Sequence, residues 1–203
     1  MGEWTQRVVE YPWVLKQLDL IKPGSLVLDV GCSESLFNQI LIQRKYSVVG
    51  LDYRDNEFPN KYLFFIKRNI LDTRLPSEMF DAAIVVSTIE HIGLGAYGQT
   101  ARDDDGDIHA LRQIAGFLKK KGILILTTPY IGHHHFYVDR FERRYNTDRL
   151  EKLVYGFRVL KEEYFFPYYH RRLLWLRMNR DEANRATFEK NRPGIACLVL
   201  SKR

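Results

Sequence analysis

The chain has 203 residues, of which 45% are hydrophobic and 28% are charged, and its formal net charge is +6 at pH 7. This length and composition exclude a disordered chain, and no run of about 18 consecutive apolar residues is long enough to span a membrane. The N-terminus has no apolar signal-peptide core, and the two cysteines, Cys32 and Cys197, have no spacing typical of a disulfide framework or a zinc site. We therefore expect residues 1–203 to form a single domain in the cytoplasm, without a metal.

Short apolar runs alternate with helical patterns along the first two thirds of the chain. The pattern predicts helices at 34–44 and 107–120, the second with Asp107 as its N-cap. Such alternation indicates a doubly wound α/β fold with a mostly parallel sheet. The strands expected in this part are 25–30, 47–52, 62–66, 81–87 and 123–128.

The last third of the chain has a different pattern. We expect a helix at 147–155 and strands at 157–166 and 195–200, which bring the sheet to seven strands. Residues 167–193 show no strand pattern and are expected to be a basic, aromatic insertion. Residues 133–203 hold 16 Lys and Arg against 9 Asp and Glu, whereas residues 1–132 hold 15 against 16. This bias indicates either an anionic partner or a charged, solvated face.

Residues with binding chemistry follow the first two predicted strands. Gly31 permits a tight turn with close approach of a ligand, Asp29 can accept from an ammonium group, and Asp52 suits the two hydroxyls of a ribose. The loop Gly-Cys-Ser-Glu-Ser lacks the further glycines of G-x-G-x-x-G, and its Glu34 disfavours a phosphate. A phosphate-free nucleoside cofactor, S-adenosylmethionine, fits these residues. The alternative is that Gly31 and Asp52 only shape the turns.

Six segments in order resemble the motifs of class I S-adenosylmethionine-dependent methyltransferases. They are VLDVGC (27–32), VVGLDYRDN (48–56), FIKRNILD (65–72), FDAAIVVSTIEHI (80–92), KKKGILILTTP (119–129) and the strand at 156–165. The EYPW and EHIGLGAYG stretches are also similar to small methyltransferases associated with polysaccharide synthesis. The resemblance implies a seven-stranded Rossmann-like sheet and S-adenosyl-L-methionine as the cofactor.

The resemblance also implies roles at the methionine end of the cofactor. Asp29, Gly31 and Cys32 match the first motif, and they are expected to line this end. Ser87, after the fourth predicted strand, is expected to lie beneath the methionine moiety.

At the nucleoside end, the resemblance implies that Asp52 holds the ribose and that Tyr53 flanks the adenine. Asn69 stands where the family often has an acid, and its amide oxygen can still accept from the adenine amino group. The backbone amide of Ile70 is expected to donate to a ring nitrogen.

Two residues after the fourth predicted strand are the candidate catalytic groups. Methyl transfer to a hydroxyl requires removal of a proton, and a histidine is suited to this near neutral pH. His91 is the expected base, and Glu90 is expected to orient its ring or to position the cofactor. The alternative is that both residues only fix the loop.

Candidate acceptor-binding residues follow the fifth predicted strand. Arginines interleaved with aromatic residues can grip a phosphate and stack on a base or a sugar. They can equally form a salt-bridged surface. The candidates are His133, His135, Arg140, Arg144 and Tyr145.

The leading hypothesis is an enzyme that methylates an oxygen or nitrogen of a small or glycan-linked acceptor, with phosphate-bearing acceptors included. An RNA or protein methyltransferase that uses the basic face is the second reading. A non-catalytic scaffold that only binds the cofactor is the third. Residues 168–180 mix arginines with leucines and Trp175, so they suit either an anionic lipid surface or a packing partner.

Overall fold

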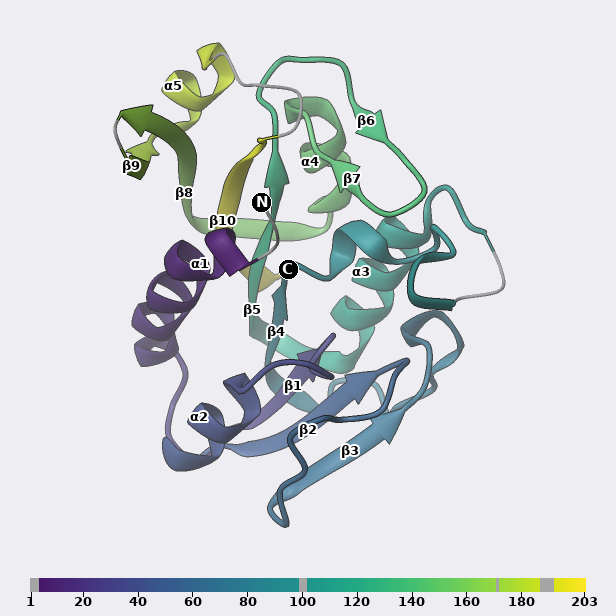
Figure 1. Cartoon of the computed structure of the whole chain (residues 1–203). Helices are drawn as coiled ribbons and strands as arrows, with labels where there is room; N and C mark the ends of the chain where they lie inside the picture. Colours follow the sequence, from purple (N-terminus) through teal and green to yellow (C-terminus); the bar gives the residue numbers. More distant parts are fainter. Residues whose placement is uncertain (1–3, 99–101, 171, 187–191) are drawn as a thin grey trace.

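The computed structural model describes residues 4–98, 102–170, 172–186 and 192–203. Its centre is an eight-stranded sheet with the order β3-β2-β1-β4-β5-β10-β8-β9 (Figure 1). The neighbours from β3 to β5 are parallel, and β10, β8 and β9 add antiparallel pairs at one side. The expected doubly wound, mostly parallel α/β fold is confirmed. The strands are β1 Leu26–Val30, β2 Ser47–Asp52, β3 Leu63–Lys67, β4 Phe80–Val86, β5 Leu118–Tyr130, β8 Phe157–His170, β9 Arg172–Met178 and β10 Gly194–Lys202, with a separate pair β6 Tyr137–Val138 and β7 Arg143–Arg144.

Helices cover both faces of the sheet (Figure 1). In β1, Val27 packs in a core with α1 and α2, whereas the next residue, Leu28, packs in a core with α3 and α4. Because both faces are buried, the central strands are almost continuously apolar, which explains why they are easily found in the sequence. The helices are α1 Trp4–Gln17, α2 Phe37–Gln43, α3 Gly106–Phe117, α4 Thr147–Leu153 and α5 Arg180–Arg185, with short 3-10 turns η1 Leu18–Leu20, η2 Ile70–Asp72, η3 Ile89–His91 and η4 Ala96–Gly98.

The expectation of seven strands is wrong, since the sheet has eight. Strand β8 continues beyond residue 166, and β9 pairs back onto it antiparallel from Tyr164↔Met178 to His170↔Arg172. Part of the segment expected to be an insertion without strands, 167–193, is therefore a β-hairpin followed by α5. Leu174 and Leu176 are partly exposed in this hairpin, so its residues do not show the alternation typical of a strand with one buried face. Residues 171 and 187–191 lie outside the described residues.

Two helices also differ from the sequence analysis. No element was expected before residue 25, yet α1 spans Trp4–Gln17 with Pro12 inside it. Helix α3 begins after Asp105, not after Asp107, and it ends at Phe117, where the chain enters β5. Asp107 lies in the first turn of α3 and is fully buried against two arginines. Tertiary ion pairs therefore decide its position, not helix capping.

No helix in the described part of the chain is long and apolar enough to cross a membrane. The strands of the large sheet come from residues between Leu26 and Lys202. That residues 1–203 form a single domain stays a prediction.

Candidate functional site: a pocket at the carboxyl ends of the strands

A pocket of about 290 Å³ lies where the parallel strands β1 to β4 end. This edge, next to the change in strand order at β1 and β4, is where doubly wound sheets bind their ligands. Of the residues predicted for the cofactor and for catalysis, those that line the pocket are Gly31, Asp52, Tyr53, Asn69, Ile70, Ser87 and His91. Asp29, Cys32 and Glu90 do not line it and are buried.

The turn after β1 is possible only because residue 31 is a glycine. Its φ of 79° lies in the left-handed region, and a Cβ added there would be 2.1 Å from Oγ1 of Thr88. The Gly31 amide donates to the carbonyl of Leu51 at 2.8 Å, which fixes the turn against β2. The Thr88 side chain therefore packs directly against the Gly31 backbone at the pocket wall, and a larger residue at position 31 would collide with it.

Asp52 joins this turn to the end of β2. Its Oδ2 accepts from the Ser33 amide at 2.8 Å, and its Oδ1 accepts from the Arg54 amide at 2.9 Å. A carboxylate has about four acceptor positions, so two backbone bonds leave capacity for the hydroxyls of a ligand. The carboxylate is thus fixed in orientation at the pocket wall.

Asp29 and Cys32 are buried beneath the turn. Burial, reinforced by the nearby Asp52, raises the pKa of Asp29 to about 8, and the charge of Arg7 partly opposes this. The Asp29 Oδ2 has no hydrogen-bond partner among the described residues. Burial also raises the pKa of the Cys32 thiol, whose sulfur packs against Gly50. Asp29 is therefore a buried acid that a cationic group would stabilise in its ionised form.

Tyr53, Asn69 and Ile70, the residues expected at an adenine, line the pocket. The Tyr53 hydroxyl donates to the carbonyl of Gly98 at 3.1 Å, which ties the end of β2 to η4. The Asn69 Oδ1 already accepts from the Leu71 amide at 3.1 Å as the cap of η2. Its amide oxygen is therefore shared between the fold and any ligand.

Helix α1 supplies pocket residues that the sequence analysis missed. Arg7 and Tyr11 line the pocket, and Arg7 donates to the carbonyl of Val86 at 3.4 Å. Between them, Glu10 is fully buried and accepts from the hydroxyls of Ser87 at 2.5 Å and Thr127 at 2.6 Å. The spacing of Arg7, Glu10 and Tyr11 places them on one side of a helix, which is the signal that could have identified them.

Arg54 lines the pocket. It forms an ion pair with Glu34, its Nε lies 3.7 Å from Asp52 Oδ1, and its guanidinium lies 4.3 Å from the ring centroid of Tyr97. Glu34 and Arg54 therefore balance each other's charge at the start of the loop that leads to α2.

His91 lines the pocket with a defined ring orientation. Its Nδ1 lies 2.6 Å from the carbonyl oxygen of Phe141, and because a carbonyl only accepts, Nδ1 carries the proton. Its Nε2 lies 4.0 Å from Glu90 Oε1. Burial, with smaller contributions from Glu10 and Glu142, raises the pKa of Glu90 well above its ordinary value. His91 and Glu90 thus form a buried pair beside the pocket.

The five candidate acceptor-binding residues do not form one cluster. His133, His135 and Arg140 are exposed on the loops that follow β5 and join β6 to β7. Arg144 is mostly buried, pairs with Glu142 at 2.5 Å and stacks on Tyr137. Tyr145 is fully buried and donates to Asp107 Oδ2 at 3.0 Å. None of the five lines the pocket.

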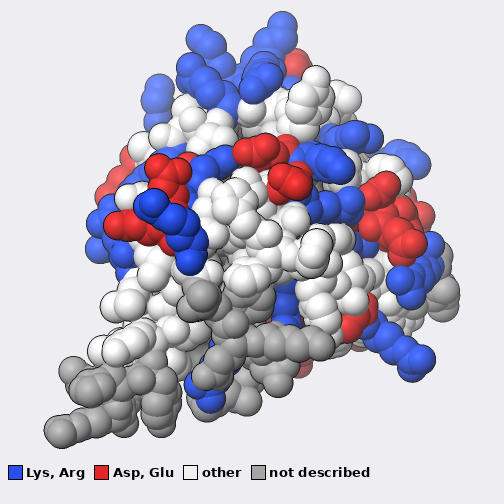
Figure 2. Space-filling model, turned by 90° about the horizontal axis from the view of Figure 1, so that it is seen from above, with Lys and Arg blue, Asp and Glu red and all other residues white. Residues whose placement is uncertain are grey.

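Several basic residues of the last third have acidic partners. Arg149, Arg177 and Arg180 each form ion pairs with carboxylates, and in Figure 2 side chains of both charges occur around a central uncharged area. The positive charge counted from the sequence is therefore offset locally at these positions, as expected for a salt-bridged surface.

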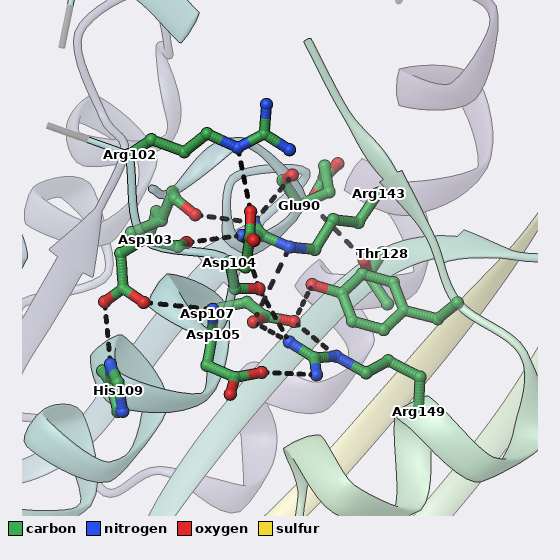
Figure 3. Close-up of polar contacts among 12 residues, drawn as sticks. Glu90, Arg102, Asp103, Asp104, Asp105, Asp107, His109, Thr128, Arg143 and Arg149 are labelled. Carbon is green, nitrogen blue, oxygen red and sulfur yellow. Dashed lines mark hydrogen bonds and ion pairs between the residues drawn. The ribbon is translucent and has the colours of Figure 1, made fainter. Parts of the chain in front are cut away.

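Close to His91, a buried polar network surrounds Arg143 and Asp107 (Figure 3). The Arg143 side chain is fully buried, and it donates to backbone carbonyls in two segments, residues 90–92 and 103–104. Arg149, from α4, donates to the Asp107 carboxylate and also pairs with Asp105. The sequence analysis did not assign Arg149 a role in the site.

Residues 56–191, about two thirds of the chain, match a family model described as "Caenorhabditis protein of unknown function, DUF268". The chain belongs to the DUF268 family. The match begins after Asp52, so it includes the His91 and Arg143 segments but not the turn at Gly31. A comparison with curated protein sequences finds no match.

Solved structures show the same fold as this DUF268 chain. A methyltransferase dependent on S-adenosylmethionine from Archaeoglobus fulgidus matches with a TM-score of 0.69 and 17% identity over 97% of this chain and 94% of that one. A 1,6-didemethyltoxoflavin-N1-methyltransferase from Burkholderia thailandensis matches with a TM-score of 0.68 and 13% identity, over 98% of this chain and 80% of that one. The [4+2]-cyclase SpnF matches with a TM-score of 0.67 and 16% identity, over 99% of this chain and 83% of that one. The resemblance to class I methyltransferases is thus confirmed for the fold.

Proposed function

We propose that this DUF268 protein is an S-adenosylmethionine-dependent methyltransferase acting on an oxygen or nitrogen of a small or glycan-linked acceptor. The observation that carries the proposal is the pocket at the ends of β1 and β2, where Asp52 is fixed by two backbone amides and Glu34 lies in the wall. A ribose suits the Asp52 carboxylate, and the pairing of Glu34 with Arg54 leaves this part of the wall without a net positive charge for a phosphate. Several structural neighbours are described as dependent on S-adenosylmethionine, which supports the same cofactor.

The residues around the pocket fit S-adenosylmethionine in charge. The buried Asp29, whose Oδ2 lacks a partner, and the fully buried Glu10 both favour the ammonium and sulfonium charges. Arg7 in the pocket wall favours the carboxylate of the methionine part. Asp52 binds the ribose hydroxyls, and Tyr53, Asn69 and Ile70 surround the adenine.

When bound, the cofactor supplies an electrophilic methyl group on its sulfonium. The chain aligns the acceptor, excludes water and accepts the acceptor's proton. His91 is the base: Nδ1 is held by the carbonyl of Phe141, which leaves Nε2 as the nitrogen with a lone pair. A positive charge on the His91 ring favours ionisation of the neighbouring Glu90, so this carboxyl stabilises the protonated ring.

For the acceptor side, the exposed Arg140, His133 and His135 are the residues we propose to contact the substrate, including a phosphate if one is present. Arg144 and Tyr145 are engaged with Glu142 and Asp107, so their proposed contribution is to hold this region in place. A second candidate function deserves a test, because SpnF, described as a [4+2]-cyclase, has the same fold. A chain that binds the cofactor without transferring its methyl group is the corresponding alternative.

Calorimetric titration with S-adenosylmethionine, S-adenosylhomocysteine and NAD tests the proposal. We expect micromolar binding of the first two ligands and no binding of NAD. Acceptors are then screened with labelled methyl groups, in the order phosphorylated sugars, glycolipids and RNA. No binding of either S-adenosyl compound would overturn the proposal, whereas binding without transfer to any acceptor class would favour the non-catalytic alternative.

A further inference from the structure

The hairpin of β6 and β7 holds the segment that carries His91 at two points. The carbonyl of Phe141 accepts from the His91 ring, and the two rings lie 4.7 Å apart between centroids. Two residues further, the Arg143 Nη1 donates to the carbonyls of Ile92 at 2.6 Å and Glu90 at 3.4 Å. One short piece of chain therefore fixes both the ring of His91 and the backbone on either side of it.

The same guanidinium reaches a second segment. Its Nη2 donates to the carbonyls of Asp103 at 3.0 Å and Asp104 at 3.2 Å, just before α3. Burying a charge of this kind is costly unless it is compensated, and here four carbonyl oxygens and the Asp107 carboxylate, 3.7 Å from Nε, supply the compensation. Arg143 thus links the His91 segment to the start of α3.

We propose that Arg143 is a positioning residue that keeps His91 in the ring orientation and tautomer needed for its role as base. The catalytic meaning of this inference rests on the proposed function, but the positioning itself does not. The carbonyls that Arg143 holds belong to the residues immediately before and after His91, so a displacement of this backbone moves the ring away from the Phe141 carbonyl. Without that acceptor, Nδ1 is no longer the preferred site of the proton.

An arginine is needed at this place because of its geometry. A guanidinium presents five donors in a planar fork, whereas a lysine ammonium has three donors at one point. A lysine at position 143 keeps the charge opposite Asp107 but cannot serve carbonyls in two separate segments at once. The substitution Arg143→Lys therefore separates charge from positioning.

The matched control is Arg149→Lys. Arg149 contacts the same Asp107 and the same Asp104 carbonyl at 3.3 Å, and it also pairs with Asp105. In the described part of the chain, no hydrogen bond or ion pair joins Arg149 to residues 90–92. We expect both variants to lower the melting temperature, because both weaken the network around Asp107.

The deciding measurement is the nitrogen-15 spectrum of the His91 ring in the cofactor-free protein, assigned by its loss in His91→Gln. In the wild type and in Arg149→Lys, we expect one neutral tautomer with the proton on Nδ1. In Arg143→Lys, we expect the two ring signals to move toward each other as both tautomers become populated. With an identified acceptor, kcat of Arg143→Lys falls about tenfold or more while the Kd for S-adenosylmethionine changes less than about twofold.

A His91 spectrum in Arg143→Lys that matches the wild type would overturn the inference. If Arg143→Lys does not fold, Arg143→Gln gives a second test with the same readout. If neither variant folds, Arg143 has a purely structural role, and this outcome also overturns the inference. Failure of the proposed function has a different signature. In that case S-adenosylmethionine does not bind the wild type, although the tautomer of His91 still responds to Arg143→Lys.

Discussion

Asp52 accepts two backbone hydrogen bonds that join the turn after β1 to the end of β2, and the same carboxylate lies in the pocket wall. Nearby, Asp29 is held as a buried acid whose Oδ2 has no partner. The two residues differ in chemistry. Asp52 is oriented by two amide donors, whereas the negative charge of Asp29 is favoured only when a cationic group binds nearby. Each difference has a measurable consequence.

Asp52→Asn is expected to weaken S-adenosylmethionine binding about tenfold or more, because two hydrogen bonds to a ribose contribute roughly 1 kcal/mol or more each. Calorimetric titration measures the change. Asp55→Asn is the control, since Asp55 is a highly exposed carboxylate paired with Lys67 on the surface. Equal affinity in Asp52→Asn and the wild type would mean that the ribose is not bound at this residue.

Asp29→Asn is expected to stabilise the cofactor-free protein at pH 8. The pKa of Asp29 is raised from 3.8 to about 8 in the folded protein. Between pH 4 and pH 8, the folded state therefore keeps a proton on Asp29 that the unfolded state has lost. Asp29 thus favours folding most below pH 4, and this contribution is lost as the pH rises to 8. An asparagine at position 29 cannot ionise, so it does not lose stability as the pH rises. We therefore expect the free energy of unfolding at pH 8 to increase by about 1 kcal/mol or more.

Denaturant unfolding at pH 5 and pH 8 measures this effect. Asp19→Asn serves as the control, because Asp19 is a largely exposed acid. The stabilised Asp29→Asn variant should bind S-adenosylmethionine more weakly, since it cannot provide a negative charge. If the free energy of unfolding of Asp29→Asn changes between pH 5 and pH 8 by the same amount as that of the wild type, the assignment of the raised pKa to Asp29 is contradicted.

At the scale of elements, the turn between β1 and α2 depends on Gly31, and the chain contains a matched glycine. Gly24 has a φ of 84°, close to the 79° of Gly31, but a Cβ there would meet no atom within 4 Å. Gly24→Ala therefore introduces only backbone strain, about 1–2 kcal/mol. Gly31→Ala adds a clash with the side chain of Thr88.

We expect Gly31→Ala to be the more destabilising of the two substitutions and to abolish cofactor binding, whereas Gly24→Ala leaves binding unchanged. Thermal unfolding and calorimetry distinguish them. Equal losses of stability in both variants would show that the close contact between the turn and Thr88 relaxes without cost.

In the molecule as a whole, several arginines of the last third lie in ion pairs with carboxylates. Arg180 contacts both Glu162 and Glu151, and Arg177 contacts Glu163. Cations that already have acidic neighbours release fewer counterions from a nucleic acid. The paired state of these residues argues against a dedicated RNA-binding face.

We therefore expect only weak binding to a generic single-stranded RNA at physiological salt, measured by fluorescence anisotropy at two salt concentrations. Tight binding that decreases steeply with salt would favour the RNA methyltransferase instead. An RNA that binds but is not methylated in the labelled-methyl assay would indicate a partner, not an acceptor.

The amino-acid sequence was enough to predict the parallel half of the sheet and the edge at which the pocket lies. Strands β1, β2 and β4 are buried on both faces, so burial leaves a continuous apolar run, and the residues that follow such runs are necessarily at the carboxyl edge. Gly31, Asp52 and His91 could be placed on this basis. The pattern is local, and the sequence contains it directly.

Only the tertiary structure decided which of the other polar residues belong to the pocket. Arg7 reaches the pocket because α1 packs against the sheet. Tyr145 is buried, and its hydroxyl donates to Asp107, which is far away in the sequence. Strand β9 forms because β8 offers an open edge, although its own residues lack the expected alternation. Buried ion pairs and strand pairing depend on residues distant in the chain, and no local pattern specifies them.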